Sequence, residues 1–209
     1  MSNRTNVDSK KCLFLISGAS GTGKTSLVGN ILKSDPNIDL SISFTTRKQR
    51  GQEVNDRDYH FVSEEQFDMM VKESEFIEWA EVHGNLYGTS RKWLENTIRE
   101  KDVILEIDHQ GASQIREKIS ESVSIFILPP CWRTLKERLA NRATDSNDSI
   151  DLRLVNAKKE MFWALSSDYV IINDDFDRAI EELRAIIMSA RLTSRQRRRD
   201  ILEMLKDLP

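Results

Sequence analysis

The sequence predicts a three-layer α/β protein in which helices cover both faces of a central parallel sheet. Short apolar runs, typical of buried parallel strands, alternate with longer segments whose apolar residues recur at helical spacing. Residues 40–90 interrupt this alternation with turn signals and β-branched residues, which indicates an inserted lobe. The net charge of −3 over 209 residues gives no electrostatic case for nucleic acid. No stretch approaches the roughly 20 apolar residues that a membrane span needs.

The first strand and helix flank the most specific motif of the chain. A strand over 12–17 leads into residues 18–25, GASGTGKT, which match the phosphate-loop pattern GxxxxGK[ST] at every fixed position. A helix over 24–33 follows, so backbone N–H groups and the helix N-terminus can surround a polyphosphate. Lys24 is expected to reach the β- and γ-phosphates, and Thr25 to ligate Mg²⁺. The residues expected to bind ATP here are Gly18, Ala19, Ser20, Gly21, Thr22, Gly23, Lys24, Thr25 and Ser26.

The remaining elements follow in order. The inserted lobe is expected to contain short strands over 40–62, a helix opened by a capping box at Ser63 and Gln66, a strand over 76–80 and a turn over 84–88. A helix capped by Thr89 or Ser90 runs to about Lys101. Beyond it, strands are expected over 103–107, 123–128 and 169–172, and helices over 110–118, 132–141, 150–165, up to about 191 and up to about 206. A polar loop is expected over 143–149.

Phosphoryl transfer to a phosphorylated acceptor requires cations for the acceptor phosphate, groups that choose its base and groups that neutralise the transferred charge. Arg47 and Arg50, three residues apart, could bind one phosphate together, with Tyr59 as a phenolic donor. A solvated basic turn would explain the same residues.

Glu78 lies in the apolar segment 76–79 and has two interpretations. It could be an edge-strand glutamate that faces solvent. Alternatively, its carboxylate could accept hydrogen bonds from N1–H and N2–H₂ of guanine. With the hydroxyls of Ser43 or Thr89 it would then reject adenine, whose N1 is an acceptor.

Charged residues at other element ends complete the candidate site. Glu106 and Asp108 lie at the carboxyl end of the strand over 103–107, where ligands bind open parallel sheets. One could hold Mg²⁺ through water and the other could contact substrate. Arg138, Arg142 and Arg153 flank the polar loop and could act as internal arginine fingers, although surface ion pairs are their usual role at such spacing.

The two cysteines and the N-terminus indicate the compartment. Cys12 and Cys131 match no metal-ligand spacing and are interpreted as free buried thiols of a reducing cytosol. Residues 1–11 are polar, lack the apolar segment of a secretory signal and are expected to form a flexible arm. We therefore expect a cytoplasmic protein without nucleic-acid or membrane partners; a homo-oligomer stays open.

Together these residues resemble the bacterial guanylate kinases over nearly the whole chain, from about Cys12 to Leu205. Beyond the phosphate loop, the resemblance rests on the order and spacing of several segments. They are Ser43-Phe44-Thr45-Thr46-Arg47 with Arg50 and Gly51, Glu53 with Asp58-Tyr59, Phe76-Ile77-Glu78-Trp79, Gly84-Asn85-Leu86-Tyr87-Gly88-Thr89, Ile107-Asp108-His109-Gln110-Gly111, Arg138 to Arg142 and Ile172-Asn173-Asp174-Asp175.

The resemblance implies a P-loop NTPase fold whose core comprises 12–39, 91–139 and 156–209. It implies a GMP-binding lobe over 40–90 and a mobile lid over 140–155. The implied reaction is phosphorylation of GMP, and by extension dGMP, by ATP with Mg²⁺, in which an oxygen of the GMP phosphate attacks directly.

The resemblance also implies roles for single residues. The GMP phosphate would be held by Arg47, Arg50, Tyr59 and Tyr87, and the base by Ser43, Glu78, Thr89 and Asp108. The transferring phosphoryl group would be stabilised by Lys24, Arg138, Arg142 and Arg153. Asn173 would lie near the adenine or ribose of ATP, and Thr25 would hold the metal with Glu106 acting through water.

The sequence departs from the family pattern at two informative places. Glu106 stands where Asp is usual, which lengthens the reach of the carboxylate. Asn141-Arg142-Ala143 replaces a more usual Gly-Arg-Gly, which would stiffen the lid hinge. Three other functions fit less well. A phosphoprotein-binding scaffold domain would tend to lose the phosphate loop, a kinase for another acceptor would not need Glu78, and a GTP switch would carry an Asn-Lys-x-Asp motif that the sequence lacks.

Overall fold

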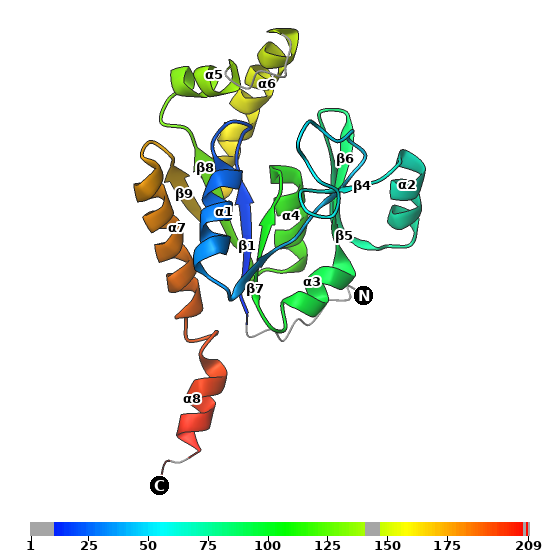
Figure 1. The fold of residues 1–209 in the computed structure, drawn as a ribbon. Coiled ribbons are helices and arrows are strands. Elements are labelled where there is room, and N and C mark those ends of the chain that lie inside the picture. The colour runs from blue at the N-terminus through cyan, green and yellow to red at the C-terminus, as the bar shows by residue number, and fades with distance from the viewer. Residues whose placement is uncertain (1–10, 141–146, 207, 209) are drawn as a thin grey trace.

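Five parallel strands form the central sheet in the order β2-β7-β1-β8-β9 (Figure 1). The computed structural model describes residues 11–140, 147–206 and 208, without the side chains of 147–153 and 199. The central strands are β1 (Leu13–Ser17), β2 (Ile38–Leu40), β7 (Asp102–Glu106), β8 (Val123–Leu128) and β9 (Tyr169–Ile172). The helices are α1 (Lys24–Ser34), α2 (Glu64–Lys72), α3 (Arg91–Thr97), α4 (His109–Lys118), α5 (Trp132–Ala140), α6 (Asn147–Glu160), α7 (Phe176–Arg191) and α8 (Arg198–Leu205), and η1 (Met161–Ser166) is a 3₁₀ helix.

The alternation of side chains along β1 creates two cores, one on each face of the sheet. Phe14 and Ile16 point to one face and pack in a cluster with buried residues of α1 and α7. Leu13 and Leu15 point to the other face and pack with residues of α3 and α4. Because successive strand residues face opposite sides, an almost entirely apolar strand needs helices on both faces. The predicted three-layer α/β fold is confirmed.

A second, four-stranded sheet lies beside the central one and forms the small lobe, residues 44–90 (Figure 1). Its strands are β3 (Phe44–Thr45), β4 (His60–Phe61), β5 (Phe76–Val82) and β6 (Asn85–Ser90), in the order β4-β3-β6-β5. The capping box predicted at Ser63 is present. The Ser63 hydroxyl accepts a hydrogen bond from the backbone N–H of Gln66, and the Gln66 side chain accepts one from the backbone N–H of Ser63. Phe67 of α2 packs against Phe76, which anchors the helix to the sheet.

Several element boundaries differ from the sequence prediction. Strand β2 was not predicted, because it has three residues and only Ile38 is buried. The turn expected over 84–88 is wrong: His83 and Gly84 make the turn with positive φ angles, and β6 begins at Asn85. Ser90, not Thr89, caps α3, which ends at Thr97 and not near Lys101.

The second half of the chain also differs in detail. Helix α6 begins at Asn147, inside the predicted polar loop, and gives way to 3₁₀ geometry after Glu160, where an α-helix was expected to continue to 165. Cys12 is buried, and burial raises the pKa of its thiol to about 11. Cys131 is exposed, so the expectation of two buried thiols is wrong for this residue. The predicted arm over 1–11 falls almost wholly outside the described residues.

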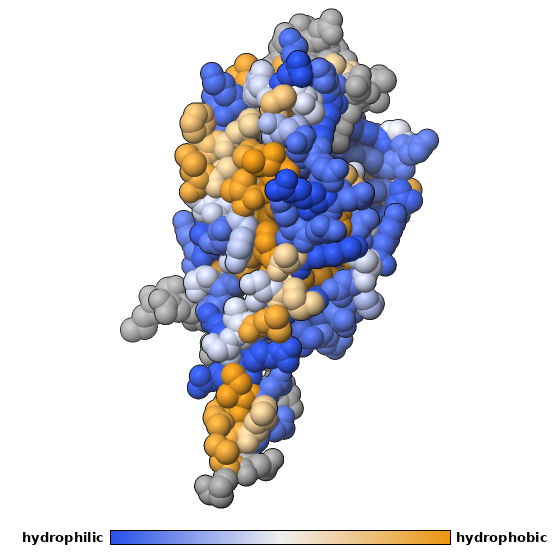
Figure 2. All heavy atoms as spheres, turned by 90° about the vertical axis from the view of Figure 1, so that its left-hand side faces the viewer, coloured by the Kyte–Doolittle hydropathy of each residue, from blue (hydrophilic) through white to orange (hydrophobic). Residues whose placement is uncertain are grey.

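Helix α8 extends away from the body of the protein (Figure 1), and apolar side chains gather along it (Figure 2). Ile201, Leu202, Met204 and Leu205 are exposed there. Among the described helices, none combines the length and apolar composition that crossing a bilayer would require.

Candidate active site

The phosphate loop connects β1 to α1 at the carboxyl end of the sheet, and close packing dictates its glycines. Gly18 has a φ of 151°, and a Cβ there would collide with the carbonyl oxygen of Ile127. Gly23 has a φ of 94°, and a Cβ there would collide with the amide of Asn173. The Lys24 ammonium lies across the loop and donates to the carbonyls of Gly18 at 2.5 Å and Ala19 at 3.2 Å.

Asn173 supports this loop from behind. Its side chain is buried, and Nδ2 donates to the Thr22 carbonyl at 2.8 Å. The backbone carbonyl of Asn173 accepts a hydrogen bond from Nη2 of Arg138 on α5 at 3.1 Å. The sequence expectation placed Asn173 near the nucleoside of ATP and Arg138 at the transferring phosphate. In the structure Asn173 contacts the loop and Arg138 contacts Asn173, and the roles expected for both residues at ATP stay predictions.

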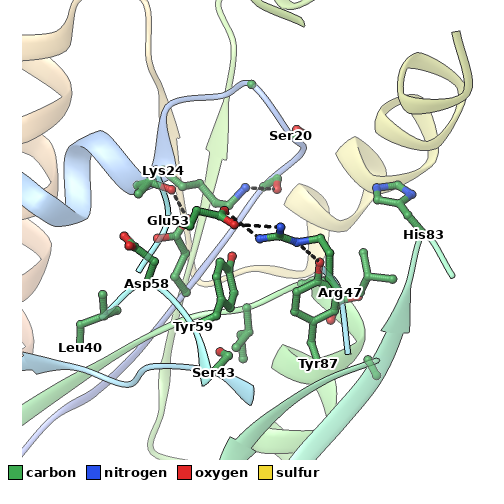
Figure 3. Close-up of a pocket in the computed structure, with 18 of the residues that line it drawn as sticks. Ser20, Lys24, Leu40, Ser43, Arg47, Glu53, Asp58, Tyr59, His83 and Tyr87 are labelled. Carbon is green, nitrogen blue, oxygen red and sulfur yellow. Dashed lines mark hydrogen bonds and ion pairs between the residues drawn. The ribbon is translucent and has the colours of Figure 1, made fainter. Parts of the chain in front are cut away.

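A cavity of about 680 Å³ lies between the phosphate loop and the small lobe (Figure 3). On the loop side it is lined by Gly18, Ser20, Gly21, Gly23, Lys24, Thr25 and Ser26. Ala19 and Thr22 are fully buried behind the loop. On the opposite side the lining includes Ser43, Arg47, Arg50, Tyr59, Glu78, Tyr87 and Asp108. The fold therefore brings residues from distant parts of the sequence to one cavity.

Arg47 is held rigidly at the lobe wall. Only 8% of the residue is exposed, which excludes the solvated-turn interpretation for it. Its guanidinium makes a bidentate pair with Glu53, at 2.8 and 3.0 Å, and Nε donates to the Tyr87 hydroxyl at 3.2 Å. Burial opposes the charge, but the bonds to Glu53 and Tyr87 raise the pKa of Arg47 above its usual value.

Tyr59 completes this cationic corner. The Arg47 guanidinium carbon lies 5.1 Å from the centre of the Tyr59 ring, within cation–π range. Burial and the carboxylate of Glu106 raise the pKa of Tyr59 to about 12. The phenol therefore keeps its proton at neutral pH and remains a hydrogen-bond donor. A buried guanidinium and a phenol therefore lie together at the cavity wall, where their positive charge and O–H group favour an anion such as a phosphate.

Glu78 is 4% exposed, which excludes the solvent-facing alternative. The Thr89 hydroxyl donates to its carboxylate. Burial, together with the charge of Asp108, raises the pKa of Glu78 to about 7, although the Thr89 hydrogen bond acts in the opposite direction. Asp108 caps α4 by accepting from the Gly111 N–H at 2.9 Å. The carboxylates of Glu78 on β5 and Asp108 at the start of α4 thus lie at one end of the cavity, where they can accept hydrogen bonds from a ligand.

Thr25 and Glu106 meet where the loop joins the sheet edge. The Thr25 hydroxyl donates to Oε1 of Glu106 at 2.7 Å. A hydroxyl and a carboxylate are oxygen ligands of the kind that Mg²⁺ prefers, so this pair fits a divalent cation that also contacts phosphates. Within the described residues, three or more His, Cys, Asp or Glu side chains nowhere gather in a preformed metal site.

The cavity also has lining residues that the sequence interpretation missed, among them Arg57, His83 and Glu160. Glu160 ends α6, and burial raises its pKa despite the nearby charge of Lys24. In the sequence it follows Lys158 and Lys159, a pattern typical of a solvated helix face, so no local signal identifies it. Arg142 lies outside the described residues. Arg153 falls in α6, where the description covers the backbone only.

The fold and the phosphate loop define a P-loop nucleotide-binding protein, in which the loop faces a cavity wall that carries Arg47, Arg50 and Tyr59. Residues 10–190 match the family model described as guanylate kinase. The guanylate kinase of Nitrosomonas europaea is 49% identical over 182 residues, 87% of this chain and 90% of the relative. That of Polaromonas sp. strain JS666 is 48% identical over 197 residues, 94% and 96% of the two chains.

The crystal structure of guanylate kinase from Anaplasma phagocytophilum superposes with a TM-score of 0.78 at 31% identity. The match covers 96% of this chain and 97% of that one. The chain belongs to the guanylate kinase family.

Proposed function

We propose that the chain transfers the γ-phosphoryl group of ATP directly to GMP, with the two substrates at opposite walls of the cavity between the phosphate loop and the small lobe. Family membership carries the reaction, ATP-dependent phosphorylation of GMP to GDP. The observation that supports the residue roles is the single cavity lined both by Lys24 and by Arg47 and Glu78. We extend the proposal to dGMP.

ATP is proposed to bind with its phosphates along the loop. Residues of the loop and of the first turn of α1 line the cavity, and the N-terminus of a helix favours negative charge. Lys24 would exchange the carbonyls of Gly18 and Ala19 for phosphate oxygens, which bind an ammonium ion more strongly. Asn173 acts from behind, by holding the Thr22 carbonyl and so the shape of the loop.

GMP is proposed to bind along the small lobe. Its phosphate would meet Arg47, Arg50, Tyr59 and Tyr87, and its base would meet Glu78 with Ser43 and Asp108. Thr89 is fully buried and bonds Glu78, so we assign it the positioning of that carboxylate. The Glu78 carboxylate would accept hydrogen bonds from the N1–H and N2–H₂ of guanine. Adenine lacks these donors and would leave the buried carboxylate without partners, which makes discrimination against adenine strong.

The chemistry needs no covalent intermediate. A phosphate oxygen of GMP attacks the γ-phosphorus in line, the bond to the β-phosphate oxygen breaks, and ADP leaves. The protein positions both groups and neutralises charge. Lys24 would stabilise the transferring group. Arg138, Arg142 and Arg153 are proposed to assist, as the family resemblance implies.

The family's nucleotide substrate calls for a divalent cation, which we propose is Mg²⁺. Thr25 and Glu106 would hold it, Thr25 directly and Glu106 through water. When bound, it would bridge and neutralise phosphate oxygens of ATP.

The function is tested by ADP release from ATP and Mg²⁺ with GMP, dGMP, AMP, UMP and dTMP as acceptors. We expect turnover with GMP and dGMP, and loss of it in Lys24→Ala. Preference for another acceptor would refute the role of Glu78 in choosing the base. Absence of turnover with every acceptor would refute the kinase assignment.

A further inference from the structure

The tip of the small lobe touches helix α6 across the cavity. His83 lies in the turn between β5 and β6, and its Nδ1 is 3.0 Å from Nδ2 of Asn156. The two residues are 73 positions apart in the sequence. Figure 3 shows the His83 ring directed toward the α6 ribbon, away from the other labelled side chains of the lobe. His83 also lines the cavity, so this contact lies at the site's edge.

The backbone presents His83 for this contact. Its φ is 52°, a left-handed conformation that side chains other than Gly, Asn and Asp seldom adopt. This conformation turns the chain between two paired strands and points the ring outward from the lobe. Since Nδ2 of Asn156 is a donor only, Nδ1 of His83 must be the acceptor in this geometry.

Helix α6 reaches the phosphate side of the cavity from the same surface. Asn156 and Glu160 are four residues apart and therefore share a helix face. Glu160 lines the cavity, and the positive charge of Lys24 partly offsets the rise that burial causes in the pKa of Glu160. Ala157, the residue after Asn156, is buried in a cluster with Ala19 of the phosphate loop. Through α6, the tip of the small lobe is thus connected to the loop that binds ATP.

We propose that His83 and Asn156 are positioning residues, whose hydrogen bond sets the separation between the small lobe and the phosphate loop during transfer. The inference rests on the function proposed above. In-line transfer requires reacting atoms about 3–3.5 Å apart, so a small displacement of one wall slows the reaction without removing any group that touches substrate.

A double-mutant cycle on kcat tests the coupling. His83→Ala and Asn156→Ala are each expected to lower kcat about three- to tenfold, with KM for ATP changed less than twofold. The double variant should lose no more than either single one, because both remove the same hydrogen bond. The cycle cancels any backbone effect of Ala at position 83. Losses that multiply, or kcat values equal to that of the unchanged protein, would overturn the proposal.

Two further variants separate positioning from folding. His83→Asn keeps an acceptor at the δ position and tolerates positive φ, so it should retain most of kcat. Val155→Ala, an exposed neighbour of Asn156, controls for helix propensity and should leave kcat unchanged. Equal losses in His83→Asn and His83→Ala would contradict a role for the hydrogen bond.

Amide hydrogen exchange tests the contact without the reaction. Asn156→Ala should increase exchange at residues 81–86, and His83→Ala should increase it at residues 154–160. Val155→Ala should leave the exchange rates of residues 81–86 unchanged. Unchanged exchange in both directions would overturn the inference even if GMP is phosphorylated. An inactive protein whose exchange responds as expected would refute the proposed function and leave the contact supported.

Discussion

The Thr89 hydroxyl donates a hydrogen bond to the Glu78 carboxylate, although the two side chains are 0% and 4% exposed, respectively. A carboxyl group this deeply buried favours its neutral form, which is why its pKa rises to about 7. The group proposed to choose the base therefore changes charge within the physiological range, whereas an exposed glutamate would stay ionised.

This shift predicts a pH-dependent KM for GMP. As the pH falls through 7, Glu78 takes up a proton and loses acceptor capacity, so KM for GMP should rise, by at most about tenfold per pH unit. Glu78→Gln should raise KM roughly ten- to hundredfold at pH 8 and flatten the profile. The GMP phosphate titrates in the same range, with a pKa of about 6. The test is therefore the difference in the pH dependence of KM for GMP between the unchanged protein and Glu78→Gln. Parallel profiles for the two proteins would contradict the role of Glu78 in binding the base.

Glu53 is expected to act on GMP through Arg47. It pairs bidentately with that guanidinium and also accepts from the Arg50 N–H at 2.8 Å. Glu53→Gln should raise KM for GMP about tenfold, because Arg47 loses its fixed orientation. KM for ATP should change little. Glu81→Gln offers a matched control for the loss of one negative charge, since Glu81 is an exposed glutamate of the same lobe outside the cavity lining. An effect on ATP as large as that on GMP would refute the assignment.

Asn173 is expected to control ATP binding through its support of the phosphate loop. Asn173→Ala leaves the buried Thr22 carbonyl without its partner, which should cost roughly 1–3 kcal/mol in the free energy of unfolding. It should also raise KM for ATP several-fold, because the loop loses its support. Asp174→Ala, at an exposed neighbour, should do neither. Denaturant titration and steady-state kinetics check both parts; a stable variant with altered GMP binding alone would be inconsistent with this role.

Much of the fold could be predicted from the sequence because its signals are local. The phosphate loop is encoded in eight consecutive residues, and the apolar runs of β1, β7 and β8 identify buried strands. Strand β2 was not predicted because it contributes only one buried side chain, Ile38, and is defined by its backbone pairing with β7.

The rest of the site depends on tertiary structure. Glu78 had two interpretations until its burial excluded one of them. Glu160 and His83 carry no local signature, since each reaches the cavity only when α6 and the β5–β6 turn are placed beside it. Asn173 could be associated with the nucleotide from its motif, but its bond to Thr22 follows from the pairing of β9 with β8, which brings the end of β9 to the loop.

Two arginines that form ion pairs, Arg191 and Arg195, should differ in their contributions to stability. Arg191 joins Asp35 at 2.7 Å and Asp102 at 2.6 Å, and Asp102 is 4% exposed. Arg191→Ala should cost roughly 3–5 kcal/mol at pH 7, because it leaves the buried carboxylate of Asp102 without its cation, while the hydrogen bond from the Cys12 N–H remains. Arg195→Ala, which removes an exposed pair with Glu121, should cost under about 1 kcal/mol.

The Arg191 effect should also depend on pH. Burial opposes ionisation of Asp35, but its hydrogen bond from Arg191 holds the pKa below the ordinary value. A depressed carboxyl pKa stabilises the fold above the unfolded pKa, and this contribution is lost as pH falls. The difference between Arg191→Ala and the unchanged protein should therefore narrow below about pH 4. A difference that is constant from pH 7 to pH 3 would assign the loss to packing.

The Thr25–Glu106 pair should set the requirement for a divalent cation. Its 2.7 Å hydrogen bond orients both oxygens at the end of the phosphate loop, so changing either should weaken cation binding more than nucleotide binding. Thr25→Val and Glu106→Gln are each expected to raise the Mg²⁺ concentration for half-maximal rate by tenfold or more. Thr25→Ser keeps the hydroxyl and should stay near the original value. Titrating Mg²⁺ at saturating ATP and GMP makes the comparison. If Glu106→Gln lowered the maximal rate while the Mg²⁺ midpoint stayed unchanged, Glu106 would act on the substrates and not on the cation.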